Sequence, residues 1–216
     1  MIGDTPSAAQ LNGLTDAFTR ELASLGRLRT YPKNTVFITE GDSSDSVFVI
    51  LSGRVKVFIS DSEGHEMILD MQGPGEYVGE MALDGKPRSA SVMTLEPSTF
   101  AVVARDPIRE AIRGNPDFAL EMISKIIDRA RIATSSVKDL ALLDVYGRVA
   151  RLLLNLSVEK DGKLVIPDKI TQQEIAERVG ASRDMVSRIF RDLTAGGYIT
   201  VENRYITINK KPPARW

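Results

Sequence analysis

The chain has 216 residues, of which 43% are hydrophobic and 26% charged, the balance of an ordinary globular protein. It contains no cysteine, which excludes disulfides, thiolate metal sites, iron–sulfur clusters and cysteine nucleophiles. We find no secretory signal pattern and no apolar stretch near the roughly 18 residues that a membrane span needs. We therefore expect a cytoplasmic protein with no membrane partner.

The formal net charge of −1 hides an uneven distribution. Residues 169–216 carry nine Lys/Arg against five Asp/Glu, a net +4, which leaves −5 for the rest of the chain. Such asymmetry is expected when only one part of a protein meets nucleic-acid phosphates. A solvated basic face would give the same excess, so charge alone leaves both interpretations open.

The N-terminal half changes from a helical to a β-rich pattern. Within residues 1–30, apolar side chains at spacings of three and four predict one helical stripe, formed by Leu11, Leu14, Phe18, Leu22 and Leu25. From Tyr31 to about Arg105 the chain consists of short β-rich runs separated by Gly, Pro and Asp. The runs are 36–38, 47–51, 55–59, 67–69 and 100–103. Many short strands predict a barrel or sandwich, here a jelly-roll-like β-roll.

Helical character returns from about Pro107 to Leu143, with Asn115 as a cap and Pro116 in the first turn. A helix of about 25 residues spans roughly 38 Å, more than one small domain covers. Its heptad seam favours pairing with a second copy, although burial on its own barrel accounts for part of the pattern. The seam consists of Ile123, Ala130 and Val137 together with Ile126, Ala133 and Leu140.

The C-terminal pattern is typical of a winged helix. Asp144 caps a helix from Val145 to Leu156, and a hairpin turns at Asp161-Gly162. Two short helices on either side of residues 179–182 precede alternating strands at 198–201 and 205–208. The predicted fold is α+β, with a roll domain at 1–107, a dimerisation helix at 108–143 and a winged helix-turn-helix at 144–216.

The two short helices form a candidate DNA-reading unit. Thr171 and Glu174 are spaced as a capping box, Gly180 permits a tight turn, and Ser182 caps the second helix. Val186, Ile189, Phe190 and Leu193 form its inward face, while its outward residues are Arg183, Asp184, Ser187, Arg188 and Arg191. This polar, basic face favours insertion into a major groove over a merely solvated amphipathic helix.

A second constellation, residues 79–92, which we call the cassette, suits an anionic sugar. Its sequence runs Gly79-Glu80-Met81-Ala82-Leu83, then Pro87-Arg88-Ser89-Ala90. Arg88 can bind a phosphate with two parallel donors, Ser89 adds a hydroxyl donor, and Glu80 can accept from a sugar hydroxyl. From residue types alone, a surface Glu–Arg salt bridge remains the alternative.

The cassette resembles the phosphate-binding cassette of the cyclic-AMP receptor protein/FNR superfamily of bacterial transcription regulators. The resemblance extends over about residues 28–208 and includes the domain order. It implies that Glu80 binds the ribose 2′-hydroxyl and that Arg88 and Ser89 bind the cyclic phosphate. Gly79, Met81 and Ala82 are implied beside the sugar.

The same resemblance implies roles in the DNA-reading unit. Arg183 and Arg188 are similar to the arginines that donate to guanine, and Asp184 stands where a longer glutamate accepts from cytosine. Three further residues, Thr171, Gln173 and Ser182, are implied to hold phosphates. Ser187 completes the expected DNA-binding set.

The effector is the open part of this interpretation. Where the family offers a Thr-Ser pair to adenine, this chain has Ala133-Thr134, so one hydroxyl contact, worth about 0.5–1.5 kcal/mol, is missing. Thr134 retains a donor for the base. Cyclic AMP is the favoured effector, while cyclic di-GMP and ligand-independent regulation remain alternatives.

The residue inventory does not favour catalysis. His65 is the single histidine and lies in the turn 63–66, so neither a haem ligand nor a nucleophile–base pair is expected. We expect no enzyme activity, no metal and no cofactor besides a nucleotide effector. The expected partners are double-stranded DNA, a second copy of the chain and RNA polymerase.

Overall fold

The computed structural model describes residues 3–213, without the side chain of Ala82. It divides the chain into two compact units. The described residues within Met1–His65 and Leu69–Arg129 form the first, and those within Glu66–Ile68 and Ala130–Trp216 form the second. Among the described residues, no helix is both long and apolar enough to cross a membrane.

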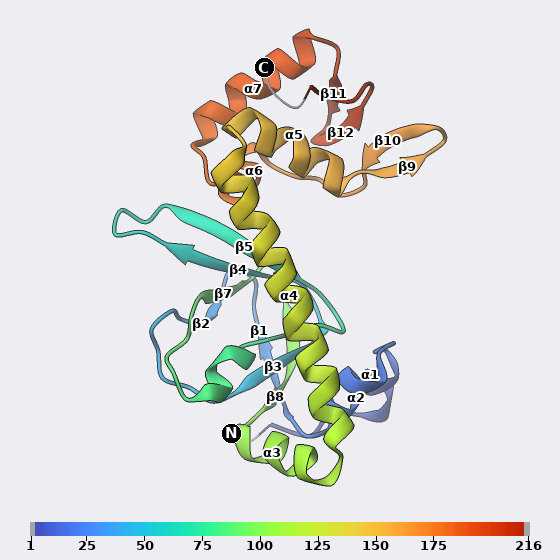
Figure 1. The fold of residues 1–216 in the computed structure, drawn as a ribbon. Coiled ribbons are helices and arrows are strands. Elements are labelled where there is room, and N and C mark those ends of the chain that lie inside the picture. Colours follow the sequence, from blue (N-terminus) through green and yellow to red (C-terminus); the bar gives the residue numbers. More distant parts are fainter. Residues whose placement is uncertain (1–2, 214–216) are drawn as a thin grey trace. The chain divides into compact units, whose positions relative to one another are not determined.

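The predicted β-roll is built from two four-stranded sheets, which belong to the first unit apart from Glu66–Ile68 (Figure 1). One sheet has the order β1-β8-β3-β6, with bounds Arg27–Tyr31, Ser98–Val103, Val47–Ser52 and Tyr77–Val78. The other has the order β2-β7-β4-β5, with bounds Val36–Ile38, Ser91–Thr94, Val55–Ser60 and Glu66–Gln72.

Strand β3 explains how the roll is held together. Its run Val47-Phe48-Val49-Ile50 is buried throughout. Successive side chains of a strand point to opposite faces, so both faces of β3 must be covered. Phe48 and Ile50 join a core containing residues of both sheets, including Val92 and Phe100. Val47 and Val49 join a second core that the helices cover.

The N-terminal helical prediction was wrong in one respect, because the apolar stripe spans two helices. Helix α1 covers Ala8–Asn12 and ends at Gly13, while α2 covers Ala17–Ser24 and begins at Asp16. The Asp16 carboxylate accepts a hydrogen bond from the amide of Thr19 at 3.2 Å, so it starts a new helix. The stripe still faces inward: Leu14, Phe18 and Leu22 are buried.

The helical region after the roll also consists of two helices. Helix α3 covers Arg105–Gly114, and after Asn115 helix α4 covers Pro116–Leu142, a continuous 27 residues. Phe118 and Met122 of α4 are buried in the helix-covered core of the first unit. In contrast, all six residues of the predicted heptad seam are exposed in the single chain.

The second unit contains the winged helix. Its helices are α5, α6 and α7, with bounds Val145–Leu156, Gln172–Val179 and Arg183–Ala195. Its sheet has the order β11-β12-β10-β9, with bounds Ile199–Glu202, Tyr205–Ile208, Lys163–Ile166 and Val158–Lys160. Side chains from the three helices and three of these strands share one core. The hairpin β11–β12, which we call the wing, is therefore packed against α7.

The turn at the tip of the wing is strained, and relieving the strain should stabilise the protein. Asn203 and Arg204 link β11 to β12 with φ of 51° and 69°, a left-handed conformation that costs most residues other than glycine energy. We expect Arg204→Gly to raise the free energy of unfolding by about 0.5–1 kcal/mol, measured by chemical denaturation. Arg204→Ala keeps the strain and should give no rise. A fall in stability for the glycine variant would contradict the assignment.

Candidate functional site

The cassette is organised around the buried guanidinium of Arg88, which is 5% exposed. Its Nη1 donates to the carbonyl of Gly79 at 2.6 Å, and its Nη2 donates to Ser44 Oγ and to the carbonyl of Ser46, both at 2.7 Å. Its backbone is bonded in both directions to the turn at residues 41–42. Arg88 is therefore held rigidly at main chain and side chain.

All the acceptors of Arg88 are neutral, which leaves its positive charge uncompensated. No carboxylate lies within ion-pair distance of it in the described part of the chain. Burial lowers the pKa of Arg88, and the more distant carboxylates of Asp45 and Glu80 oppose that shift. A buried charge is normally paired, so this arrangement is suited to receive an anion.

Gly79 is required by the position of Arg88. It has φ of +89°, and a Cβ atom placed there would lie 2.6 Å from Arg88 Nη1 and 3.0 Å from the carbonyl oxygen of Ser46. Both the backbone conformation and the contact exclude a side chain. Sequence reasoning named Gly79, but this packing reason is visible only in the structure.

Replacing Gly79 should therefore disturb the seat of Arg88. We expect Gly79→Ala to lower the free energy of unfolding by about 1–3 kcal/mol, measured by urea denaturation. Gly73→Ala is the matched control, because Gly73 has open space around its Cβ direction and no left-handed φ. Equal stability of the two variants would show that the Arg88 side chain can move away from residue 79 without lowering the free energy of unfolding.

A short helix follows Gly79 in the cassette. It is a 3₁₀ helix, η1, of five residues, Glu80–Asp84. Met81 is 64% exposed, and its sulfur accepts a hydrogen bond from Ser89 Oγ at 3.2 Å. The side chain of Ala82 lies outside the described residues. Gly79, Glu80, Met81, Arg88 and Ser89 are thus brought together in the first unit.

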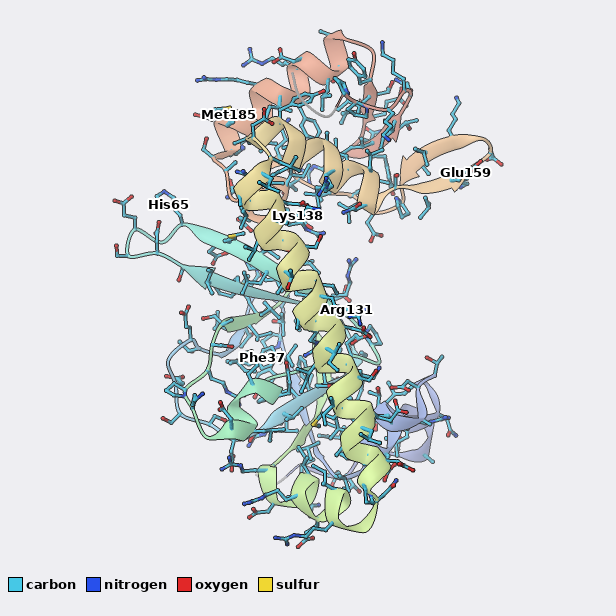
Figure 2. The ribbon with its side chains drawn as sticks, viewed as in Figure 1. Phe37, His65, Arg131, Lys138, Glu159 and Met185 are labelled. Atoms are coloured by element: carbon cyan, nitrogen blue, oxygen red, sulfur yellow. The ribbon has the colours of Figure 1, made fainter. Side chains whose placement is uncertain are left out.

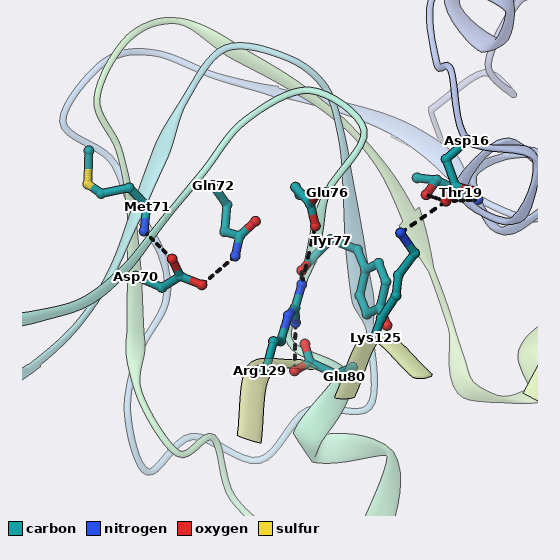
Figure 3. Close-up of polar contacts among 10 residues, drawn as sticks. All are labelled: Asp16, Thr19, Asp70, Met71, Gln72, Glu76, Tyr77, Glu80, Lys125 and Arg129. Atoms are coloured by element: carbon teal, nitrogen blue, oxygen red, sulfur yellow. Dashed lines mark hydrogen bonds and ion pairs between the residues drawn. The ribbon is translucent and has the colours of Figure 1, made fainter. Parts of the chain in front are cut away.

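Glu80 has a partner that sequence reasoning missed, Arg129 of α4. Arg129 Nη1 lies 2.8 Å from Glu80 Oε1, and its Nη2 donates to the carbonyl of Tyr77 at 2.5 Å (Figure 3). The guanidinium also lies over the Tyr77 ring, 4.6 Å from its centroid. Burial opposes the charge of Arg129, but Glu80, Tyr77 and Glu76 together outweigh burial, so the pKa of Arg129 is raised.

One signal could have identified Arg129 in the sequence. It follows Phe118, Met122 and Lys125 at spacings of four, three and four, which places all four on one face of α4. Phe118 and Met122 are buried against the roll, so an arginine that continues this face points toward the roll as well. By contrast, Thr134 belongs to the second unit, where its hydroxyl donates to the carbonyl of Ala130 at 2.9 Å.

The helix-turn-helix has the expected caps and turn. Thr171 Oγ1 accepts from the amide of Glu174 at 3.1 Å, and Ser182 Oγ accepts from the amide of Met185 at 3.2 Å. Gly180 adopts the left-handed conformation, with φ of 61°. The predicted capping box is only half formed, because the carboxylate of Glu174 accepts from Arg178 at 2.6 Å.

The outward face of α7 is charged and accessible. Arg183, Asp184 and Arg188 are exposed, and Ser187 is half-buried. In the described chain, neither arginine has a carboxylate within ion-pair distance, so both guanidinium groups are available. Gln173 is also exposed, and its amide donates to Glu177 at 2.9 Å.

Arg148 of α5 is a further residue that sequence reasoning did not identify. Its Nη1 donates to the carbonyl of Leu143 at 3.0 Å, and its Nε donates to the carbonyl of Val179 at 2.8 Å. A longer bond of 3.4 Å reaches the carbonyl of Gly180. One side chain therefore joins the link after α4 to the turn between α6 and α7.

Comparison with known proteins places both constellations in one class. Residues 28–115 match the cyclic nucleotide-binding domain family, and residues 147–212 match the Crp-like helix-turn-helix domain family. The cAMP-activated global transcriptional regulator CRP of Salmonella typhimurium is 35% identical over 187 residues, which cover 84% of this chain and 89% of that protein. The CRP-like cAMP-activated regulator of Mycobacterium tuberculosis is 31% identical over 184 residues, covering 83% of this chain and 82% of that protein.

A solved structure of a similar protein places the chain in the same class. The c-di-GMP responsive global regulator CLP of Xanthomonas campestris has a TM-score of 0.78 and 26% identity, covering 90% of this chain and all of that one. The chain is thus a cyclic nucleotide-binding transcription regulator with a helix-turn-helix. It belongs to the CRP/FNR family, whose members are dimeric DNA-binding proteins without enzyme activity.

Proposed function

We propose that the chain is a cyclic AMP-controlled regulator that binds palindromic operators as a homodimer. The observation that carries the effector proposal is the buried, uncompensated guanidinium of Arg88 behind Gly79. Two relatives above 30% identity are named as cAMP-activated, which favours cyclic AMP among anionic sugars.

In this proposal each cassette residue has a role. Arg88 and Ser89 bind the cyclic phosphate, and Glu80 accepts from the ribose 2′-hydroxyl while Arg129 holds its carboxylate in place. The backbone at Gly79, Met81 and Ala82 borders the sugar. Thr134 donates to the base.

DNA recognition is assigned to the second unit. Arg183 and Arg188 donate to guanine and Asp184 accepts from cytosine. Phosphate contacts come from Thr171, Gln173 and Ser182, and Ser187 completes the DNA-binding set. Two copies pair through the exposed seam of α4, which would cover Ile123, Ile126, Val137 and Leu140.

We further propose a functional division into a roll domain at 1–107, a dimerisation helix at 108–143 and a DNA-binding domain at 144–216. Nucleotide binding beside α4 would change how the paired helices meet and so the spacing of the two reading helices. The protein would act in the cytoplasm, where its DNA lies, with RNA polymerase as a partner.

Cyclic di-GMP is the second candidate effector. It is favoured by the similarity to the Xanthomonas campestris regulator and by Ala133, which cannot offer the hydroxyl that adenine recognition uses in this family.

Calorimetric titration with cyclic AMP, cyclic GMP and cyclic di-GMP tests the proposal. We expect saturable heat with cyclic AMP, and then tighter binding of a palindromic duplex in its presence. Saturable binding of cyclic di-GMP alone would replace the effector, and no heat with any nucleotide would indicate a ligand-independent regulator.

A further inference from the structure

Helix α7 exposes one large apolar side chain, Met185, in its first turn. Met185 is 41% exposed, whereas the other large apolar residues of α7 are buried: Val186, Ile189, Phe190 and Leu193. The remaining exposed residues of this fully described helix are charged or small. Figure 2 shows Met185 at the end of α7 that follows the turn from α6.

The position of Met185 along α7 is fixed by the cap. Its amide donates to Ser182 Oγ, which makes Met185 the third residue of the helix, next to Asp184 and one turn before Arg188. The first residues of a reading helix are those that reach base edges in the major groove. Met185 contributes nothing to the core of the winged helix, so its thioether is free to contact a ligand.

The major groove presents one prominent apolar group, the 5-methyl group of thymine. Charged neighbours such as Arg188 and Asp184 can hydrogen-bond the polar edges of guanine and cytosine, but they make no favourable apolar contact with a methyl group. An unbranched, polarizable methionine adapts its shape to an apolar partner and gains free energy by removing that surface from water.

We propose that Met185 contacts the 5-methyl group of a thymine in the operator and gives the protein a preference for thymine at that position. The proposal rests on the DNA reading assigned to α7 above. Burial of one methyl group corresponds to an affinity difference of about threefold to fourfold.

The test removes the methyl group from the DNA and the side chain from the protein. An operator is first selected by the wild-type protein from a random duplex pool in the presence of cyclic AMP. Each thymine of a half-site is then replaced by deoxyuridine, which lacks only the methyl group. Affinities are measured by fluorescence anisotropy for wild type, Met185→Ala, Met185→Leu and the control Val201→Ala, whose residue is 43% exposed outside α7.

We expect deoxyuridine at one thymine to weaken wild-type, Met185→Leu and Val201→Ala binding about threefold to fourfold. Met185→Ala should bind the thymine and deoxyuridine operators equally. The assignment is overturned if no thymine is methyl-sensitive, or if Met185→Ala keeps the full methyl effect. A wild-type protein that selects no sequence overturns the proposed function itself and this assignment with it.

Discussion

Replacing Arg88 with leucine is expected to weaken cyclic AMP binding at least about 100-fold, equivalent to about 3 kcal/mol. The guanidinium is the only cation that the structure holds buried among neutral acceptors in the described cassette, so the phosphate would lose both of its parallel donors. Isothermal calorimetry measures the loss, and thermal unfolding checks that the roll remains folded.

Two variants separate this role from a structural one. Arg88→Lys keeps the charge but not the forked geometry, and it should bind with intermediate affinity. Arg105→Leu also removes an arginine bonded to a main-chain carbonyl, that of Leu83, but outside the seat of Arg88. It should leave affinity within a few-fold of wild type. Wild-type affinity in Arg88→Leu would refute the phosphate assignment.

Replacing Arg188 with alanine is expected to cost about 1–3 kcal/mol on the cognate operator, about 5–150-fold in affinity. The expected loss is specific: the base pair that Arg188 contacts should become interchangeable, while non-specific binding changes little. Binding to a panel of operators with single base-pair substitutions, measured at fixed salt, reveals this pattern.

Arg191→Ala provides the comparison, because Arg191 is also exposed on α7 but lies nearly one turn further from its start. We expect Arg191→Ala to weaken binding to all sequences alike and to reduce its salt dependence. If Arg188→Ala behaves in the same uniform way, Arg188 contacts a phosphate and the guanine is bound by another residue.

Local signals in the sequence predicted most of the fold. The caps at Asp144, Thr171 and Ser182, the left-handed Gly180 and the inward face of α7 all depend on residues within one or two turns of each other. The β-roll followed from short strands and turn residues, and family comparison confirmed the class. The break between α1 and α2 was less visible in the sequence. Gly13 and Asp16 interrupt an apolar stripe whose spacing alone implied one helix.

Long-range partners could not be predicted in this way. Glu80 and Arg129 are 49 positions apart, and no spacing rule connects them until α4 is packed on the roll. The same holds for the hydrogen bond from Arg148 to the carbonyl of Val179, 31 positions further along the chain. The half-formed capping box at Thr171 shows that even a local motif loses a bond when a closer charged partner, here Arg178, competes for Glu174.

The hydrogen bonds of Arg148 also limit how the second unit can deform. If the chain direction changed at Leu143 while α6 stayed in place, a charged donor would lose an acceptor, at a cost of about 1.5–3 kcal/mol for each bond broken. Bending there is thus cheaper when the turn at Val179 and Gly180 moves along with it. A rotation of the chain at the end of α4 would therefore turn α6 and α7 together with it, with little bending at Leu143.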